Sequence, residues 1–131
     1  MGFNILIVDD SEVVRAVVKK TIAMSGIETN VIHEAKNGLE ALEKLSTEWI
    51  DIVFADLCMP VMDGLELIQK MSENNLLYSI PVVIVSSDRS EARIEDLKQK
   101  GIRAYIKKPF RPENFRDVVT EVLGTAGGPT P

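Results

Sequence analysis

Short apolar runs alternate five times with stretches of helical periodicity, and this alternation constrains the fold of the chain more than any other feature. The apolar runs, which predict strands, lie at 4–9, 28–34, 51–55, 82–86 and 103–107. The helical stretches lie at 11–25, 39–46, 65–72, 90–100 and 112–123. Strands that alternate with helices pair in parallel through right-handed crossovers. The sequence therefore predicts an α/β fold, a doubly wound five-stranded parallel sheet with helices on both faces.

Two of the helical stretches indicate which of their side chains face the sheet. The pattern in 39–46 also pairs Glu40 with Lys44 on the outer face of the helix. The strand predicted at 28–34 is more polar than the others, which favours a place near the edge of the sheet. The apolar residues expected to point inward are Val14, Val17, Val18 and Ile22 in 11–25, and Leu39, Leu42 and Leu45 in 39–46.

Acidic side chains occur where two of the predicted strands end. Asp9 and Asp10 follow Ile5–Val8, and Asp56 follows Ile52–Ala55. The carboxyl ends of parallel strands form the ligand crevice of an open sheet, and a flavodoxin-like strand order, 2-1-3-4-5, makes the first and third strands neighbours. Three carboxylates in one crevice repel one another unless a cation lies between them, and a hard cation such as Mg²⁺ prefers oxygen ligands. The alternative is three separate solvated acids, since Asp is a common helix N-cap.

A hydroxyl and an ammonium group follow two further strands. Ser86 ends the fourth predicted strand, and Lys107 and Lys108 end the fifth. A metal ion and a lysine can neutralise the charge of a transferring phosphoryl group while a carboxylate acts as the nucleophile. The chain has no phosphate-binding loop of the form G-x-x-x-x-G-K-[ST]. We therefore expect it to receive a phosphoryl group rather than to bind ATP.

Six short motifs with a characteristic order and spacing carry a family resemblance. They are Ile7–Asp10, Glu34–Ala35 with Asn37–Gly38, Glu40–Leu42, Asp56–Gly64, Val85–Ser87 and Tyr105–Phe110. With these motifs, residues 3–124 resemble the receiver domain of response regulators in two-component systems, and most of all the stand-alone, chemotaxis-type regulators. The resemblance implies a receiver domain at 1–124. The remainder, 125–131, is expected to be a flexible tail, either the remnant of a linker or an artificial addition.

The resemblance implies a phosphoacceptor site. Asp56 is expected to accept a phosphoryl group from the phosphohistidine of a sensor histidine kinase or phosphotransfer protein. It implies that Asp10 and Asp56 bind Mg²⁺ directly, Asp9 through water and Cys58 through its backbone carbonyl. It also implies that Lys108 contacts the phosphoryl oxygens. We further expect the Lys108–Pro109 peptide bond to be cis.

The resemblance also implies a switch. Ser86 is expected to hydrogen-bond the aspartyl phosphate, and Tyr105 to turn inward as the loop after Ser86 moves. These movements would change the face formed by the fourth helix, the fifth strand and the fifth helix, where a downstream protein partner binds. Cys58 and Asp88 flank the path of a hydrolytic water, so the lifetime of the phosphorylated state is left open.

Composition excludes several other classes of protein. The net charge is −5; residues 1–88 carry 6 Lys/Arg against 14 Asp/Glu, and residues 89–131 carry 9 against 6. This acidity argues against direct binding to nucleic acid. No apolar run approaches the ~20 residues that span a bilayer, and no export signal is visible. The single cysteine, Cys58, suits a reducing cytoplasm, where we expect the protein to act. We also expect a monomer that dimerises at most transiently and does not bind membranes.

Other functions remain open at this stage. The chain is expected not to be an enzyme beyond self-directed phosphotransfer and autodephosphorylation. A phosphorelay shuttle and a receiver cut from a longer regulator are the alternatives within the family. A Mg²⁺-dependent phosphatase with an aspartate nucleophile is a remote alternative, because such an enzyme usually has a second acid two residues after the nucleophile, where this chain has Cys58.

Overall fold

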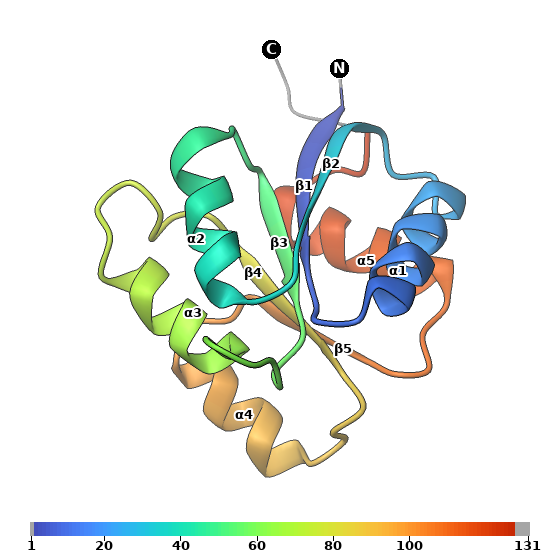
Figure 1. Cartoon of the computed structure of the whole chain (residues 1–131). Coiled ribbons are helices and arrows are strands. Elements are labelled where there is room, and N and C mark those ends of the chain that lie inside the picture. The colour runs from blue at the N-terminus through green and yellow to red at the C-terminus, as the bar shows by residue number, and fades with distance from the viewer. Residues whose placement is uncertain (1, 128–131) are drawn as a thin grey trace.

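Five parallel strands form a single sheet in the order β2-β1-β3-β4-β5 (Figure 1). The computed structural model describes residues 2–127, so positions 128–131 of the predicted tail lie outside the described residues. The strand order confirms the flavodoxin-like prediction and places the polar strand at an edge. The strands are β1 (Phe3–Val8), β2 (Thr29–Ala35), β3 (Ile52–Ala55), β4 (Val82–Ser86) and β5 (Ala104–Lys107).

Helices cover both faces of the sheet, which makes three layers. Figure 1 shows α1 and α5 on one face and α2, α3 and α4 on the other. No helix among residues 2–127 is long and apolar enough to cross a membrane. The helices are α1 (Glu12–Met24), α2 (Gly38–Thr47), α3 (Gly64–Ser72), α4 (Glu91–Gln99) and α5 (Pro112–Leu123).

Alternate side chains of each central strand enter two separate apolar cores. On β3, Val53 packs in the core beneath α2, α3 and α4, whereas Phe54 packs in the core beneath α1 and α5. There the ring of Phe115 lies 5.2 Å from that of Phe54, centroid to centroid. Because both faces of the sheet are covered, the inner strands are apolar apart from Asn4 near the start of β1 and Ser86 at the end of β4. The acids follow directly where β1 and β3 end.

The buried stripes of two helices are narrower than the sequence predicts. Val17 is 50% exposed and Leu39 is 47% exposed, although both were expected to point inward. In α1 the buried residues are Val18 and Ile22, and successive residues of an α-helix are turned by about 100°, which directs Val17 away from the sheet. Leu39 is similarly displaced from the buried positions of α2, Ala41 and Leu45.

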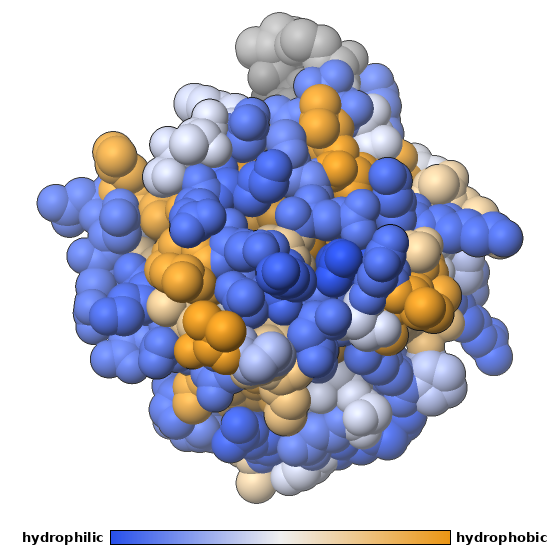
Figure 2. All heavy atoms as spheres, in the orientation of Figure 1, coloured by the Kyte–Doolittle hydropathy of each residue, from blue (hydrophilic) through white to orange (hydrophobic). Residues whose placement is uncertain are grey.

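The predicted ion pair on α2 is also wrong. Glu40 lies 3.6 Å from the ammonium of Lys36 rather than pairing with Lys44, and it accepts a hydrogen bond from the Lys36 amide. The side chain of Asn37 caps the helix by accepting from the Glu40 amide, so Glu40 is turned back toward the start of α2. Figure 2 shows that this face of the molecule is mostly hydrophilic, with its apolar side chains in separate groups.

Two leucines test this description of the core. Leu67 on α3 is fully buried, whereas Leu76, in the segment between α3 and β4, is 85% exposed. We expect Leu67→Ala to lower the free energy of unfolding by about 2–5 kcal/mol, because it removes buried apolar contacts and leaves a cavity. The matched variant Leu76→Ala should change it by less than about 0.5 kcal/mol. Urea unfolding measures both, and equal effects would contradict the assigned core.

Candidate functional site

The pairing of β1 with β3 brings the predicted acids together. Val8 lies opposite Ala55, so Asp9 and Asp56 leave the sheet side by side, with Asp10 next in the chain. One carboxylate oxygen from each of the three acids lies within 4.8 Å of the others. Opposite ligands of one Mg²⁺ ion are about 4.2 Å apart, twice the usual bond of about 2.1 Å. This donor set therefore fits a single hard cation after a small adjustment, or with one acid bound through water.

Backbone contacts fix the two acids at the strand ends. Asp9 accepts a hydrogen bond of 2.9 Å from the amide of Ser11, and Asp56 accepts one of 2.9 Å from the amide of Leu57. The loop after β3 packs closely behind Asp56, because a Cβ atom at Gly64 would collide with the Asp56 carbonyl oxygen. Only glycine fits at the start of α3, which explains the Asp-Gly pair at the end of this loop.

Arg15 supports the acidic loop from α1, and sequence reasoning did not identify it. Its guanidinium donates to the carbonyl oxygen of Asp9 at 2.7 Å and to the carboxylate of Glu34 at 3.0 Å. It thereby ties the end of β1 to β2. The only sequence signal was a single cation in the first turns of the helix that follows two acids. Its partners become visible only when β2 is placed beside β1.

Lys108 brings a positive charge to the acids from the end of β5. Its ammonium lies 3.8 Å from a carboxylate oxygen of Asp9. The backbone of Lys108 donates to the carbonyl of Ser86 at 2.9 Å and accepts from the guanidinium of Arg89 at 3.0 Å. The peptide bond to Pro109 is cis, as predicted. The loop that holds this lysine is therefore anchored to β4 and to the segment before α4.

Ser86 and Tyr105 are joined through the backbone of Asp88. The buried hydroxyl of Ser86 accepts a hydrogen bond of 3.2 Å from the Asp88 amide. The hydroxyl of Tyr105 donates to the Asp88 carbonyl at 2.6 Å. Tyr105 does not reach the acids; it lines a separate pocket of about 310 Å³ with Arg89 and Lys107. The two predicted switch residues thus contact the same loop from different sides.

The site holds more negative charge than its surroundings balance. Burial raises the pKa of Asp9 and of Asp56 above the ordinary value of 3.8, and the neighbouring carboxylates raise both further. The ammonium of Lys108 acts in the opposite direction on both groups, but the net pKa of each remains raised. A divalent cation would remove this imbalance.

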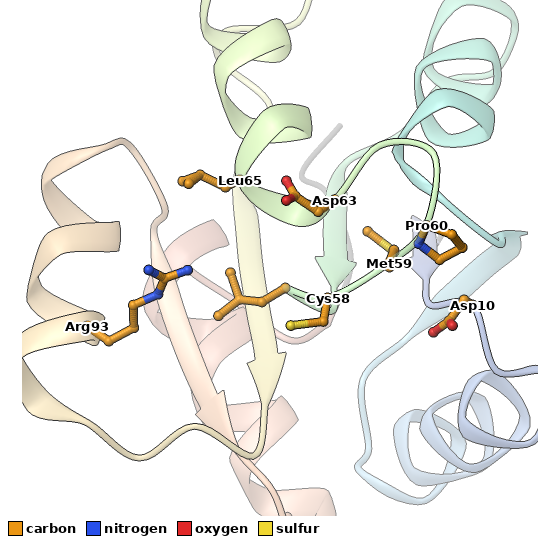
Figure 3. A pocket seen from close by; sticks show the side chains of 8 residues that line it. Asp10, Cys58, Met59, Pro60, Asp63, Leu65 and Arg93 are labelled. Carbon is orange, nitrogen blue, oxygen red and sulfur yellow. The ribbon is translucent and has the colours of Figure 1, made fainter.

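An open pocket of about 460 Å³ lies beside the acids (Figure 3). Cys58, whose side chain is exposed, stands between Asp10 and Arg93 in this view. Arg93 comes from α4, and no sequence motif indicates that it lines the pocket. The lining residues are Asp10, Leu57, Cys58, Met59, Pro60, Asp63, Leu65 and Arg93.

Known proteins match the chain in sequence and in fold. The profile of the response regulator receiver domain family matches residues 5–120. The chemotaxis protein CheY1 of Helicobacter pylori is 34% identical over 123 residues, which cover 93% of this chain and 98% of that protein. The chemotaxis response regulator CheY4 of Vibrio cholerae superposes with a TM-score of 0.82 at 26% identity, over 93% of this chain and 99% of that one.

A further solved structure has the same fold with a metal ion. It is the receiver domain of a sensor histidine kinase from Pseudomonas aeruginosa, with a magnesium ion coordinated in its active-site cleft. It superposes with a TM-score of 0.82 at 20% identity, over 95% of this chain and all of that one. The family profile covers most of the chain, and the strand order and the acidic cluster agree with it. The chain belongs to the response-regulator receiver domain family.

Proposed function

We propose that this receiver domain accepts a phosphoryl group on Asp56, in a Mg²⁺-dependent reaction with the phosphohistidine of a sensor histidine kinase or phosphotransfer protein. The convergence of three carboxylates with the ammonium of Lys108 carries the proposal. Asp56 is held by its own backbone contact, with one oxygen bonded to the Leu57 amide. Its second oxygen is the nucleophile. It forms the new bond to phosphorus as the bond between phosphorus and the histidine nitrogen breaks.

Asp9, Asp10 and Asp56 would hold the metal ion, together with the backbone carbonyl of Cys58. When bound, Mg²⁺ supplies positive charge that offsets the charge of the phosphoryl oxygens. Lys108 contributes a second positive charge from the end of β5. Its side chain is 27% exposed and its ammonium is close to Asp9, so a short movement brings the ammonium to a phosphoryl oxygen. Arg15 positions Asp9 by binding its carbonyl oxygen.

Phosphorylation changes the surface through Ser86 and Tyr105. The Ser86 hydroxyl, whose oxygen in the present structure accepts from the Asp88 amide, can donate its proton to an oxygen of a phosphoryl group on Asp56, and a movement of Ser86 toward that group carries the Asp88 loop with it. A shift of this loop also moves the carbonyl that binds Tyr105. The face made of α4, β5 and α5 would thereby present a different surface to a downstream protein. Such a local charge change biases an element between two arrangements.

We infer a cytoplasmic, chemotaxis-type signalling role. The similarity to CheY1 over 98% of that protein supports this role over a phosphorelay shuttle. A receiver within a longer regulator is the second alternative. Cys58 stands where an aspartate-nucleophile phosphatase has its general acid, which disfavours turnover of outside substrates. The chain would catalyse only the transfer of a phosphoryl group to its own Asp56 and the later hydrolysis of that aspartyl phosphate.

Replacement of the acceptor tests the proposal directly. With acetyl phosphate and Mg²⁺, we expect the wild-type protein to gain one phosphoryl group and Asp56→Asn to gain none, because the amide is not a nucleophile for phosphorus. Mass spectrometry of the intact protein measures the gain. Asp117→Asn, which changes an exposed acid on α5, is the control and should be labelled normally. Full labelling of Asp56→Asn would refute the acceptor assignment.

The charge imbalance of the site predicts a stability effect. Because the pKa of Asp56 is raised in the folded state, the folded protein binds more protons than the unfolded one above pH 3.8. The contribution of Asp56 to the free energy of unfolding therefore falls as the pH rises from 3.8 through the raised pKa of this group. Without metal at pH 7, we expect Asp56→Asn to raise the free energy of unfolding, because the amide removes a partly buried charge that lies beside two other carboxylates. The gain should shrink as the pH falls through the raised pKa of Asp56 and be absent below pH 3.8.

Urea unfolding with a chelator measures this difference, and Asp117→Asn again serves as the control. Saturating Mg²⁺ should stabilise the wild-type protein and reduce or reverse the advantage of Asp56→Asn, because the variant lacks one of the three carboxylates. A variant that is less stable than wild type in the metal-free protein at pH 7 would contradict the electrostatic account.

Removal of the Ser86 hydroxyl tests whether phosphorylation of Asp56 and the surface change that follows it can be separated. We expect Ser86→Ala to accept the phosphoryl group, because the nucleophile and the acids are intact. Its amide chemical shifts in α4 and β5 should change less on phosphorylation than those of wild type. Ser90→Ala, which removes a hydroxyl from the N-cap of α4, controls for local loosening. An undiminished response in Ser86→Ala would contradict the switch role.

A further inference from the structure

The pocket beside the acids has ends of opposite charge. Figure 3 shows Asp10 at one end and Arg93, which reaches out from α4, at the other, with Cys58 between them. Asp10 belongs to the acidic cluster, and the same pocket wall continues to Arg93. A molecule that fills this pocket beside the cluster therefore meets a guanidinium group at its far end.

The charge of Arg93 is not committed to another part of the protein. Within residues 2–127 no carboxylate lies within 4.0 Å of its guanidinium, whereas nearby cations have partners. Lys107 pairs with Glu91 at 3.1 Å, and Arg89 donates to the carbonyl of Lys108 at 3.0 Å. Lys108 itself lies beside Asp9. Arg93 is thus the cation on this rim that is available to a ligand, and its planar group suits carboxylate or phosphate.

We propose that Arg93 is a donor-binding residue that receives the anionic leaving group of small acyl phosphates, and so selects for this class of phosphodonor. This inference rests on the proposed function of Asp56. Lys108 and the acidic cluster occupy the end of the site where the phosphoryl group is transferred. In-line displacement puts the leaving oxygen on the side of phosphorus opposite the nucleophile. The donor then extends past Cys58 toward Arg93.

The reaction with an acyl phosphate balances without a proton. The Asp56 carboxylate forms a bond to phosphorus, the bond from phosphorus to the acyl oxygen breaks, and the electron pair leaves with a carboxylate anion. Negative charge grows on this leaving group in a loose transition state. Arg93 offers two parallel N–H donors to it. Phosphoramidate, in contrast, releases neutral ammonia, so Arg93 gives this donor no comparable advantage.

The experiment compares two donors in the same protein preparation. Rate constants for labelling of the full chain by acetyl phosphate and by phosphoramidate are measured at saturating Mg²⁺ in wild type, Arg93→Ala and Arg93→Lys. The ratio of the two rates does not depend on the folded fraction of the preparation. Lys98→Ala is the matched control, because it removes one exposed positive charge from α4 outside the pocket. Each measurement is repeated at high salt.

We expect Arg93→Ala to lower the acetyl phosphate rate about threefold, as for an exposed charge contact, and to leave the phosphoramidate rate nearly unchanged. Arg93→Lys should keep most of the wild-type ratio, and Lys98→Ala all of it. The difference between donors should shrink at high salt. An unchanged ratio in Arg93→Ala, whether both rates fall or neither does, would overturn the proposal. Failure of Asp56 as the acceptor is a separate result, seen as labelling of Asp56→Asn.

Discussion

The site depends on three like charges that are held close together at the carboxyl ends of the inner strands β1 and β3. The pairing of Val8 with Ala55 places Asp9 and Asp56 next to each other, and the chain adds Asp10. Burial raises the pKa of Asp9 and Asp56, so the folded chain bears an electrostatic cost at neutral pH. The apolar cores on both sides of the sheet stabilise the fold enough to offset this electrostatic cost. The proposed binding of a cation would offset the negative charge itself.

The surroundings of this cluster connect it to the rest of the surface. Lys108 is anchored to β4 by its own amide and to the segment before α4 by Arg89. The loop that carries Asp88 binds Ser86 on one side and Tyr105 on the other. These hydrogen bonds connect the ends of β4 and β5 with the segment before α4, next to the acidic cluster.

Much of this arrangement is predictable from the sequence because it follows from chain order. The alternation of strands and helices fixes the layers, and acids at the ends of two buried strands point to one crevice. The contacts of Arg15 and the position of Arg93 at the pocket were not predictable, because both depend on elements that are distant in the chain. The exposure of Val17 and Leu39 depends on how each helix is rotated on the sheet, which a periodic pattern specifies only to within about one residue, or 100°. The link from Tyr105 to Asp88 needs the path of a loop, and no motif encodes that path.

Anomalous diffraction from crystals soaked in Mn²⁺ tests whether the three carboxylates share one cation, because this ion takes similar oxygen ligands and is visible at its absorption edge. We expect one ion, bound by oxygens of Asp10 and Asp56 and the carbonyl of Cys58, with Asp9 at most one water away. An empty cluster at saturating Mn²⁺, or an ion bound elsewhere with these carboxylates turned apart, would contradict it.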